Sequence, residues 1–209
     1  MSISIYSQYE KLPVKKFQAW KDSLLTPLAK KLRALGATAD GVSATSAFII
    51  SASFLYSLVY KQPEVFVVGL WTHFLLDGLD GTIARTDKSK RKLNPIVDIA
   101  VDYSGIVAAV SMSWFAAVSD RLPALVFLSV YSLVIALTIW RRHIKKPYAL
   151  VIRPRVIFYT ALTIDIFFFT HLTEPIMWIG TALLIPPAIT GLWVATKEAK
   201  KNLPFLSYK

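Results

Sequence analysis

Six long apolar segments alternate with short polar segments along this chain, and this pattern predicts helices that cross a membrane. Each segment is long enough for a helix to cover about 30 Å of hydrocarbon. The segments cover residues 42–60, 65–84, 95–118, 122–140, 156–172 and 176–195. The sequence therefore predicts an all-α integral membrane fold with six transmembrane helices.

The segment before the first span has a different pattern, in which apolar residues recur every three or four positions with lysines between them. These apolar residues are Phe17, Trp20, Leu24, Leu28, Leu32 and Leu35. The spacing predicts an N-terminal amphipathic helix that lies in the membrane interface. Thr26 followed by Pro27 resembles a helix start, which would divide it into two short helices. This helix is either a generic anchor or an element that gathers lipid beside a site.

The basic residues decide the orientation of the chain in the membrane. The sequence has 24 Lys and Arg against 13 Asp and Glu, but the basic residues gather before span 1 and after spans 2, 4 and 6. The opposite loops hold only Lys61 and Arg121. The positive-inside rule therefore places both termini in the cytoplasm and argues against a nucleic-acid partner. We expect residues 1–41 to form a cytoplasmic arm, 42–195 the transmembrane domain and 196–209 a cytoplasmic tail, in the plasma membrane of a prokaryote.

Four carboxylates gather in the stretch DGLDGTIARTDKSKRKLNPIVDIAVD. Asp77 and Asp80 are three residues apart and Asp98 and Asp102 four apart, so on helices each pair shares a face. Both pairs lie near the cytoplasmic ends of consecutive spans, and antiparallel helices would bring them together. A cation must neutralise such a cluster. The loop lysines and arginines are one candidate, and two hard divalent ions such as Mg²⁺ are the other.

Small residues next to the carboxylates favour a bound phosphate ligand over a purely structural network of ion pairs. Gly81 directly follows Asp80, and Ala84 lies one turn further along the same face. Both leave room for a ligand close to the backbone. Arg85 carries a planar guanidinium that can bind a phosphate with two hydrogen bonds. There is no cysteine, which excludes thiol catalysis and disulfides.

This stretch closely resembles the signature of the CDP-alcohol phosphotransferases, DxxDGxxARx8GxxxDxxxD. The spacing is kept throughout, and the one departure is Asn94 where the signature has glycine. Asn tolerates the left-handed region better than most residues, and with Pro95 it also suits a helix start. The matching residues are Asp77, Asp80, Gly81, Ala84, Arg85, Asp98 and Asp102.

The resemblance implies a reaction and a role for each residue. A CDP-linked lipid donor would bind through its pyrophosphate to two divalent ions, Mg²⁺ or Mn²⁺. The metal ligands would be Asp77, Asp80 and Asp98, with Asp102 near the metals and acting as general base toward the acceptor hydroxyl. CMP would leave as a phosphodiester forms. The resemblance further implies that Gly81, Ala84 and Arg85 line the nucleotide and pyrophosphate, and that the protein is a homodimer among membrane lipids.

Two further segments resemble members of the family that act in phosphatidylinositol phosphate synthesis. Residues 38–43 resemble a TPDxVT segment that touches the donor, which implies donor contacts by Asp40, Gly41 and Val42. Arg153, Pro154 and Arg155 resemble an arginine and proline motif near a phosphorylated acceptor, and Arg91 is a further candidate for this site. The small polar alcohol acceptor would then be a phosphorylated polyol such as inositol phosphate or glycerol phosphate. Ala39 replaces the proline, and the acidic residue between the arginines is absent.

Several alternatives remain open at this point. The donor is CDP-diacylglycerol or a CDP-archaeol analogue in one arrangement, and CDP-choline or CDP-ethanolamine with diacylglycerol as acceptor in another. A membrane prenyltransferase also uses aspartates and Mg²⁺, and a transporter or other non-catalytic membrane protein would need no turnover. His73, one turn before Asp77, either contacts the ligands of a bound metal ion or caps a polar face. Asp165 falls within span 5, where it is protonated, paired or part of a cavity.

Overall fold

The computed structural model describes residues 11–87, 95–146, 148 and 154–202, and within these ranges the chain is helical with no strand. The prediction of an all-α fold is therefore confirmed for the described part of the chain. The helices are α1 (Lys11–Ala34), α2 (Ala39–Tyr60), α3 (Pro63–Asp87), α4 (Pro95–Phe115), α5 (Arg121–His143), α6 (Arg155–Phe168) and α7 (Thr173–Asn202).

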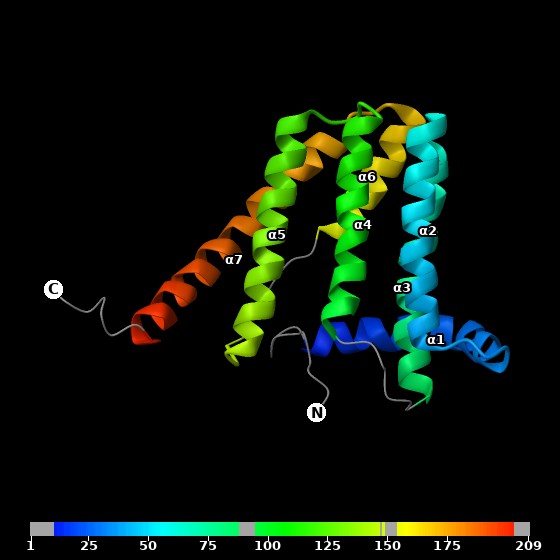
Figure 1. Ribbon diagram of the computed structural model, residues 1–209, viewed down its shortest axis with the longest axis horizontal. Coiled ribbons are helices and arrows are strands. Elements are labelled where there is room, and N and C mark those ends of the chain that lie inside the picture. Colours follow the sequence, from blue (N-terminus) through cyan, green and yellow to red (C-terminus); the bar gives the residue numbers. More distant parts are fainter. Residues whose placement is uncertain (1–10, 88–94, 147, 149–153, 203–209) are drawn as a thin grey trace.

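Figure 1 shows α2 to α6 running up and down side by side, with α7 leaning away from the others and α1 lying across their lower end. The most extensive contacts join α2 to α3 and α5 to α7, and α1 packs against α3. The short turns between α2 and α3, α4 and α5, and α6 and α7 all lie at the upper end. The first and last helical residues of the chain lie toward the lower end, as the predicted topology requires.

Three helices of the described residues are long and apolar enough to cross a membrane, by length and composition. They are Ala39–Tyr60, Arg121–Arg141 and Thr173–Ala199, and Ile99–Phe115 is a shorter apolar helix. α3 carries Asp77 and Asp80 of the signature, and α6 has only 14 residues. Large apolar side chains such as Phe48, Val59 and Trp193 remain exposed on the outside of the helices, as a membrane protein requires. The number of six spans stays a prediction.

Two apolar clusters hold the helices together. The larger fills the bundle with side chains from α2 to α7, among them Phe66, Ile106, Phe127 and Phe158. The smaller lies at the lower end and joins α1 to α2 and α3 through Ala29, Ala39, Val42, Leu79 and Ile83. The smaller cluster fixes the N-terminal arm against the half of α3 that carries the signature.

α1 is one helix with Pro27 inside it, so the interpretation as two short helices is wrong. The Thr26 hydroxyl donates back to the carbonyl oxygen of Asp22 at 2.5 Å, a bond within a continuing helix. Pro27 lacks only one backbone donor, and packing of α1 on α3 stabilises the helix despite that loss.

α6 ends at Phe168, four residues before the end of the predicted span, and this changes the place of Asp165. Phe169 adopts the left-handed conformation, with φ of 53°, and the chain turns into α7. Asp165 is fully buried in the last turn of α6. It accepts hydrogen bonds from the Thr170 hydroxyl at 2.6 Å and from the backbone N–H groups of Leu172 at 2.8 Å and Thr173 at 2.6 Å. Asp165 is thus paired, and it caps the turn between two helices.

Candidate functional site

Three helices bring two signature carboxylates and an arginine together inside the lower half of the bundle. Asp77 comes from α3, Asp102 from α4 and Arg155 from the first turn of α6. The Arg155 guanidinium lies 3.3 Å from Asp77 Oδ2 through Nη2 and 3.3 Å from Asp102 Oδ1 through Nη1. All three side chains are only partly exposed, at 22–36%. The predicted convergence of the two carboxylate pairs is confirmed for these two residues, and Arg155 offsets part of their negative charge.

Asp80 faces a different neighbour. It is buried, with 4% of its surface exposed, and accepts a short hydrogen bond from the Ser43 hydroxyl of α2. Since α2 begins at Ala39, this contact ties the start of α2 to the signature. Thr38 caps α2 by accepting the Gly41 N–H at 3.0 Å.

The predicted donor-binding residues Asp40, Gly41 and Val42 form the first turn of α2. Val42 is buried in the lower apolar cluster, Asp40 is half-buried and Gly41 is exposed. Ala39, which replaces the proline of the related segment, occupies the first helical position, where either residue is acceptable. The structure thus places Ser43, the last residue of this segment, against Asp80, although the donor contacts of the segment stay a prediction.

Several predicted site residues lie beyond what the structure describes. Asp98 is in α4, one turn before Asp102, but its side chain is outside the described set. Arg91, Asn94 and Arg153 fall outside the described residues altogether. Among the side chains that are described, no group of three His, Asp or Glu is placed to hold a metal ion. The assignment of Asp77, Asp80, Asp98 and Asp102 as metal ligands stays a prediction.

The donor set nevertheless fits a hard divalent cation. Asp77 and Asp102 offer only carboxylate oxygens, which Mg²⁺ and Mn²⁺ prefer. The pair already draws one positive group, the Arg155 guanidinium, into a partly buried position. A place that attracts this guanidinium has the negative potential that a divalent ion requires.

Arg85 is held by a residue that sequence reasoning missed. Asp22 of α1 accepts hydrogen bonds from Arg85 Nε at 2.9 Å and Nη2 at 2.6 Å, and from the Thr82 hydroxyl at 2.9 Å. Burial opposes ionisation of Asp22, but the hydrogen bonds from Arg85 and Thr82 outweigh it and hold its pKa below the ordinary value. Asp22 is the only carboxylate between Glu10 and Asp40, which is the signal that could have found it.

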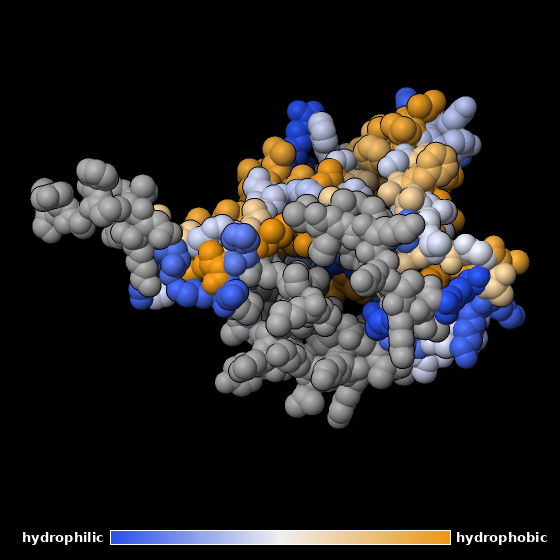
Figure 2. Space-filling model, turned by 60° about the horizontal axis from the view of Figure 1, so that its bottom comes forward, coloured by the Kyte–Doolittle hydropathy of each residue, from blue (hydrophilic) through white to orange (hydrophobic). Residues whose placement is uncertain are grey.

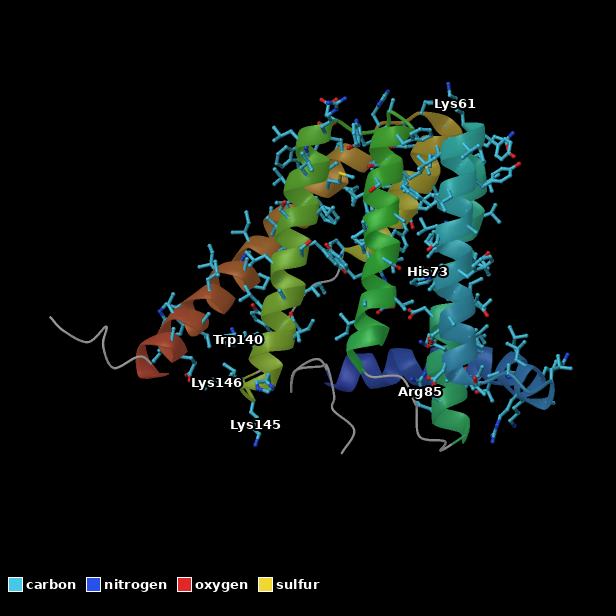
Figure 3. All side chains as sticks on the ribbon, in the orientation of Figure 1. Lys61, His73, Arg85, Trp140, Lys145 and Lys146 are labelled. Carbon is cyan, nitrogen blue, oxygen red and sulfur yellow. The ribbon has the colours of Figure 1, made fainter. Side chains whose placement is uncertain are left out.

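A second polar layer lies one helical turn deeper in the bundle. Each of its residues lies one helical turn from a residue of the site: His73 from Asp77 on α3, Gly105 from Asp102 on α4, and Tyr159 from Arg155 on α6. Figure 3 shows His73 within the bundle. His73 Nδ1 lies 2.7 Å from the Ser46 hydroxyl. A Cβ at Gly105 would lie 2.7 Å from His73 Nε2 and 2.9 Å from the Tyr159 hydroxyl. His73 is fully buried, so its polar contact with Ser46 lies inside the bundle.

Several basic side chains of the described residues lie toward the lower end of the molecule. Figure 2 looks onto this end and shows hydrophilic residues at its left and right edges, with hydrophobic residues on the sides of the bundle. Arg85, Lys145 and Lys146 all lie toward this end in Figure 3, whereas Lys61 lies at the opposite end. The candidate site therefore lies in the half of the bundle next to the end that carries Arg85, Lys145 and Lys146.

Comparisons with known proteins identify a family and a fold for this chain. The sequence model of the CDP-alcohol phosphatidyltransferase family matches residues 37–186. No curated protein sequence matches the chain.

Three crystal structures of the phosphatidylinositol phosphate synthase of Mycobacterium tuberculosis have a similar fold. The structure with manganese and citrate has a TM-score of 0.67 and 19% identity, over 80% of this chain and 87% of that chain. The structure with bound CDP-DAG gives 0.66 and 18%, over 81% and 92%. The apo form gives 0.64 and 17%, over 79% and 93%. At this level of identity the likeness establishes the fold.

Proposed function

Because the chain belongs to the CDP-alcohol phosphatidyltransferase family, we propose that it transfers a phosphatidyl or archaetidyl group from a CDP-linked lipid to the hydroxyl of a small polar alcohol. The observation that supports this reaction best is the meeting of Asp77, Asp102 and Arg155 from three helices, beside the rest of the family signature. Phospholipid synthesis by CDP-lipid transfer is the activity of this family.

Asp102 is our candidate for the general base. It is partly exposed, so a substrate hydroxyl can reach it, and it lies next to Arg155. Asp102 would accept the proton of the acceptor hydroxyl as the hydroxyl oxygen forms a bond to the phosphorus that carries the lipid. The bond from that phosphorus to the oxygen of CMP breaks at the same centre, and CMP leaves with the electron pair.

The carboxylates Asp77, Asp80, Asp98 and Asp102 would hold two divalent ions, Mg²⁺ or Mn²⁺. When bound, these ions would neutralise the pyrophosphate of the donor and the charge on leaving CMP. The structure of the Mycobacterium tuberculosis enzyme with manganese supports this proposal by analogy of fold. Gly81 and Ala84 would leave space for the nucleotide, and Arg85 would bind the pyrophosphate together with the first turn of α2.

For the acceptor we propose a phosphorylated polyol such as inositol phosphate or glycerol phosphate. Arg155 already lies beside the candidate base, so an acceptor phosphate bound to its guanidinium would bring the neighbouring hydroxyl toward Asp102. Arg153 and Arg91 are further candidates for the same phosphate. The similar fold of a phosphatidylinositol phosphate synthase, which was solved with CDP-DAG, supports both the acceptor and a diacylglycerol-type donor.

We also propose six spans, with the site and both termini on the cytoplasmic side of a prokaryotic plasma membrane, and a homodimer as the working form. The division into arm, transmembrane domain and tail at residues 41 and 195 belongs to the same proposal. The gathering of basic residues at the end that carries Arg85 supports this orientation.

CMP release from the purified protein tests the reaction. The protein in detergent would receive CDP-diacylglycerol and Mg²⁺ or Mn²⁺, with glycerol phosphate, inositol phosphate, serine, inositol or no acceptor. We expect release that depends on one phosphorylated acceptor and falls at least about 100-fold in Asp102→Asn. Asp120→Asn, an exposed carboxylate change at the opposite end of the bundle, is the matched control and should leave release unchanged. If no acceptor gives CMP above the level of Asp102→Asn, the proposed donor and reaction are wrong.

A further inference from the structure

The N-terminal helix reaches the signature through one ion pair with a definite geometry. Asp22 binds the Nε and Nη2 side of the Arg85 guanidinium with bonds of 2.9 and 2.6 Å. The hydroxyl of Thr82, which lies one turn before Arg85 on α3, donates a third hydrogen bond to the Asp22 carboxylate at 2.9 Å. A guanidinium held on one edge by a carboxylate loses its freedom to rotate.

The Arg85 guanidinium lies over Gly81, one turn before it on α3. None of its hydrogen bonds with the described residues uses Nη1. A Cβ at Gly81 would lie 3.2 Å from Nη1, 3.6 Å from Nη2 and 3.8 Å from Cζ, so Nη1 is the guanidinium atom nearest to the glycine that follows Asp80. Asp22 therefore leaves a donor of Arg85 available at the place where the signature carries no side chain.

The packing of α1 on α3 supports the ion pair between Asp22 and Arg85. Ala29 of α1 is buried, with 1% of its surface exposed. It packs with Leu79 and Ile83 of α3 in the lower apolar cluster. Leu25 lies against Gly78, where a Cβ would come within 3.2 Å of its Cδ1. The apolar face of α1 thus fixes the height and rotation at which Asp22 meets Arg85.

Stability alone does not explain this arrangement. The Arg85 side chain is 45% exposed and the Asp22 side chain 27% exposed, and ion pairs that are this accessible contribute little to folding. The lowered pKa of Asp22 keeps it ionised at neutral pH, so it remains a good acceptor for the guanidinium. The main effect of the ion pair is therefore to fix the orientation of the Arg85 guanidinium.

We propose that Asp22 is a positioning residue that holds Arg85 with its Nη1 edge toward the anionic pyrophosphate of the CDP-linked donor. This inference rests on the proposed function. It makes α1 a part of the donor site, in addition to an anchor at the membrane surface. It also means that the donor site includes a residue outside the signature and outside the region matched by the family model.

Donor kinetics of Asp22 variants test this proposal. We expect Asp22→Asn to raise the KM for CDP-diacylglycerol about tenfold while kcat changes less than about twofold, because the loss concerns donor binding. Asp22→Glu keeps the charge and should recover most of the affinity. Lys30→Gln removes a charge from an exposed position on the same helix and should leave KM unchanged.

A double-mutant cycle separates positioning from a general effect on folding. If Asp22 acts through Arg85, Asp22→Asn should have no further effect on KM in an Arg85→Ala background. An equal rise of KM in both backgrounds would overturn the proposal, as would an unchanged KM in Asp22→Asn of an active enzyme. Binding of CDP-diacylglycerol to Asp102→Asn, measured by calorimetry with and without Asp22→Asn, should show the same tenfold loss without turnover.

The two proposals fail in different ways. A wild-type protein that neither binds CDP-diacylglycerol nor releases CMP contradicts the proposed function. A wild-type protein that does both, with Asp22→Asn indistinguishable from it, contradicts only the role of Asp22.

Discussion

Arg155 supplies the positive charge that a divalent ion would otherwise bring to Asp77 and Asp102. Its guanidinium lies 3.3 Å from both carboxylates. Two unit charges about 4 Å apart interact by roughly 4 kcal/mol at an effective dielectric constant of about 20, so Arg155 and a nearby cation oppose each other. We expect Arg155→Gln to bind Mn²⁺ about tenfold more tightly or better than wild type, measured by calorimetry in detergent. The same variant should lose turnover with a phosphorylated acceptor.

The variant Arg155→Lys keeps a charge but cannot contact both carboxylates with one planar group, so its Mn²⁺ affinity should be intermediate. Arg121→Gln removes an arginine at the opposite end of the bundle and serves as the control. Unchanged or weaker Mn²⁺ binding by Arg155→Gln would contradict the prediction that the charge of Arg155 opposes binding of the metal ion.

Gly105 is required because two side chains approach its backbone closely. A Cβ there would lie 2.7 Å from His73 Nε2 and 2.9 Å from the Tyr159 hydroxyl. We expect Gly105→Ala to destabilise the protein by about 1–3 kcal/mol, seen as a lower Tm in detergent. Adding Tyr159→Phe removes one of the two contacts and should recover part of the loss, whereas Tyr159→Phe alone should be nearly neutral. A Tm of Gly105→Ala equal to that of wild type would contradict this packing.

At the scale of elements, Asp165 joins α6 to α7. It accepts three hydrogen bonds from Thr170, Leu172 and Thr173 while fully buried. Asp165→Ala would leave two backbone N–H groups without this acceptor, and we expect it to cost about 2 kcal/mol or more. Thr170→Val removes only one side-chain donor and should cost about 1 kcal/mol or less. Thermal unfolding of both variants measures the difference, and an Asp165→Ala protein as stable as wild type would refute the capping role.

The sequence predicted elements best where one strong pattern acts alone. Long apolar runs gave the helices α2, α5 and α7, and helical periodicity gave α1. Periodicity did not predict that α6 ends at Phe168, because the turn combines a left-handed Phe169 with hydrogen bonds from later residues to the Asp165 side chain. Pro27 misled the reading of α1, because packing of the helix on α3 outweighs one missing hydrogen bond.

The sequence predicted one part of the candidate site and could not predict another. Spacing along helices was enough to bring Asp77 and Asp102 together, since each helix presents one face to the other. The partner of Arg85 could not be predicted, because it depends on how deeply and at what rotation α1 docks on α3. The place of Arg155 between the carboxylates likewise depends on the contacts of α6 with both α3 and α4.

The whole molecule has one basic end and one nearly neutral end. Figure 3 shows Lys145 and Arg85 toward the lower end, where α1 also lies, and Lys61 at the upper end. The loops of the upper end hold only Lys61 and Arg121 as basic residues. Since membrane proteins keep basic loops in the cytoplasm, the lower end with the candidate site should face the cytoplasm.

Cysteine labelling tests this orientation directly, because the chain has no cysteine of its own. Lys61 and Lys145 form a matched pair, since both are exposed and both have positive φ, 55° and 58°. In intact cells a membrane-impermeant maleimide should label Lys61→Cys, and it should label Lys145→Cys only after the membrane is opened. The opposite result would place the site outside the cell, and equal labelling of both in intact cells would contradict a membrane between them. Either result would overturn the topology on which the cytoplasmic site rests.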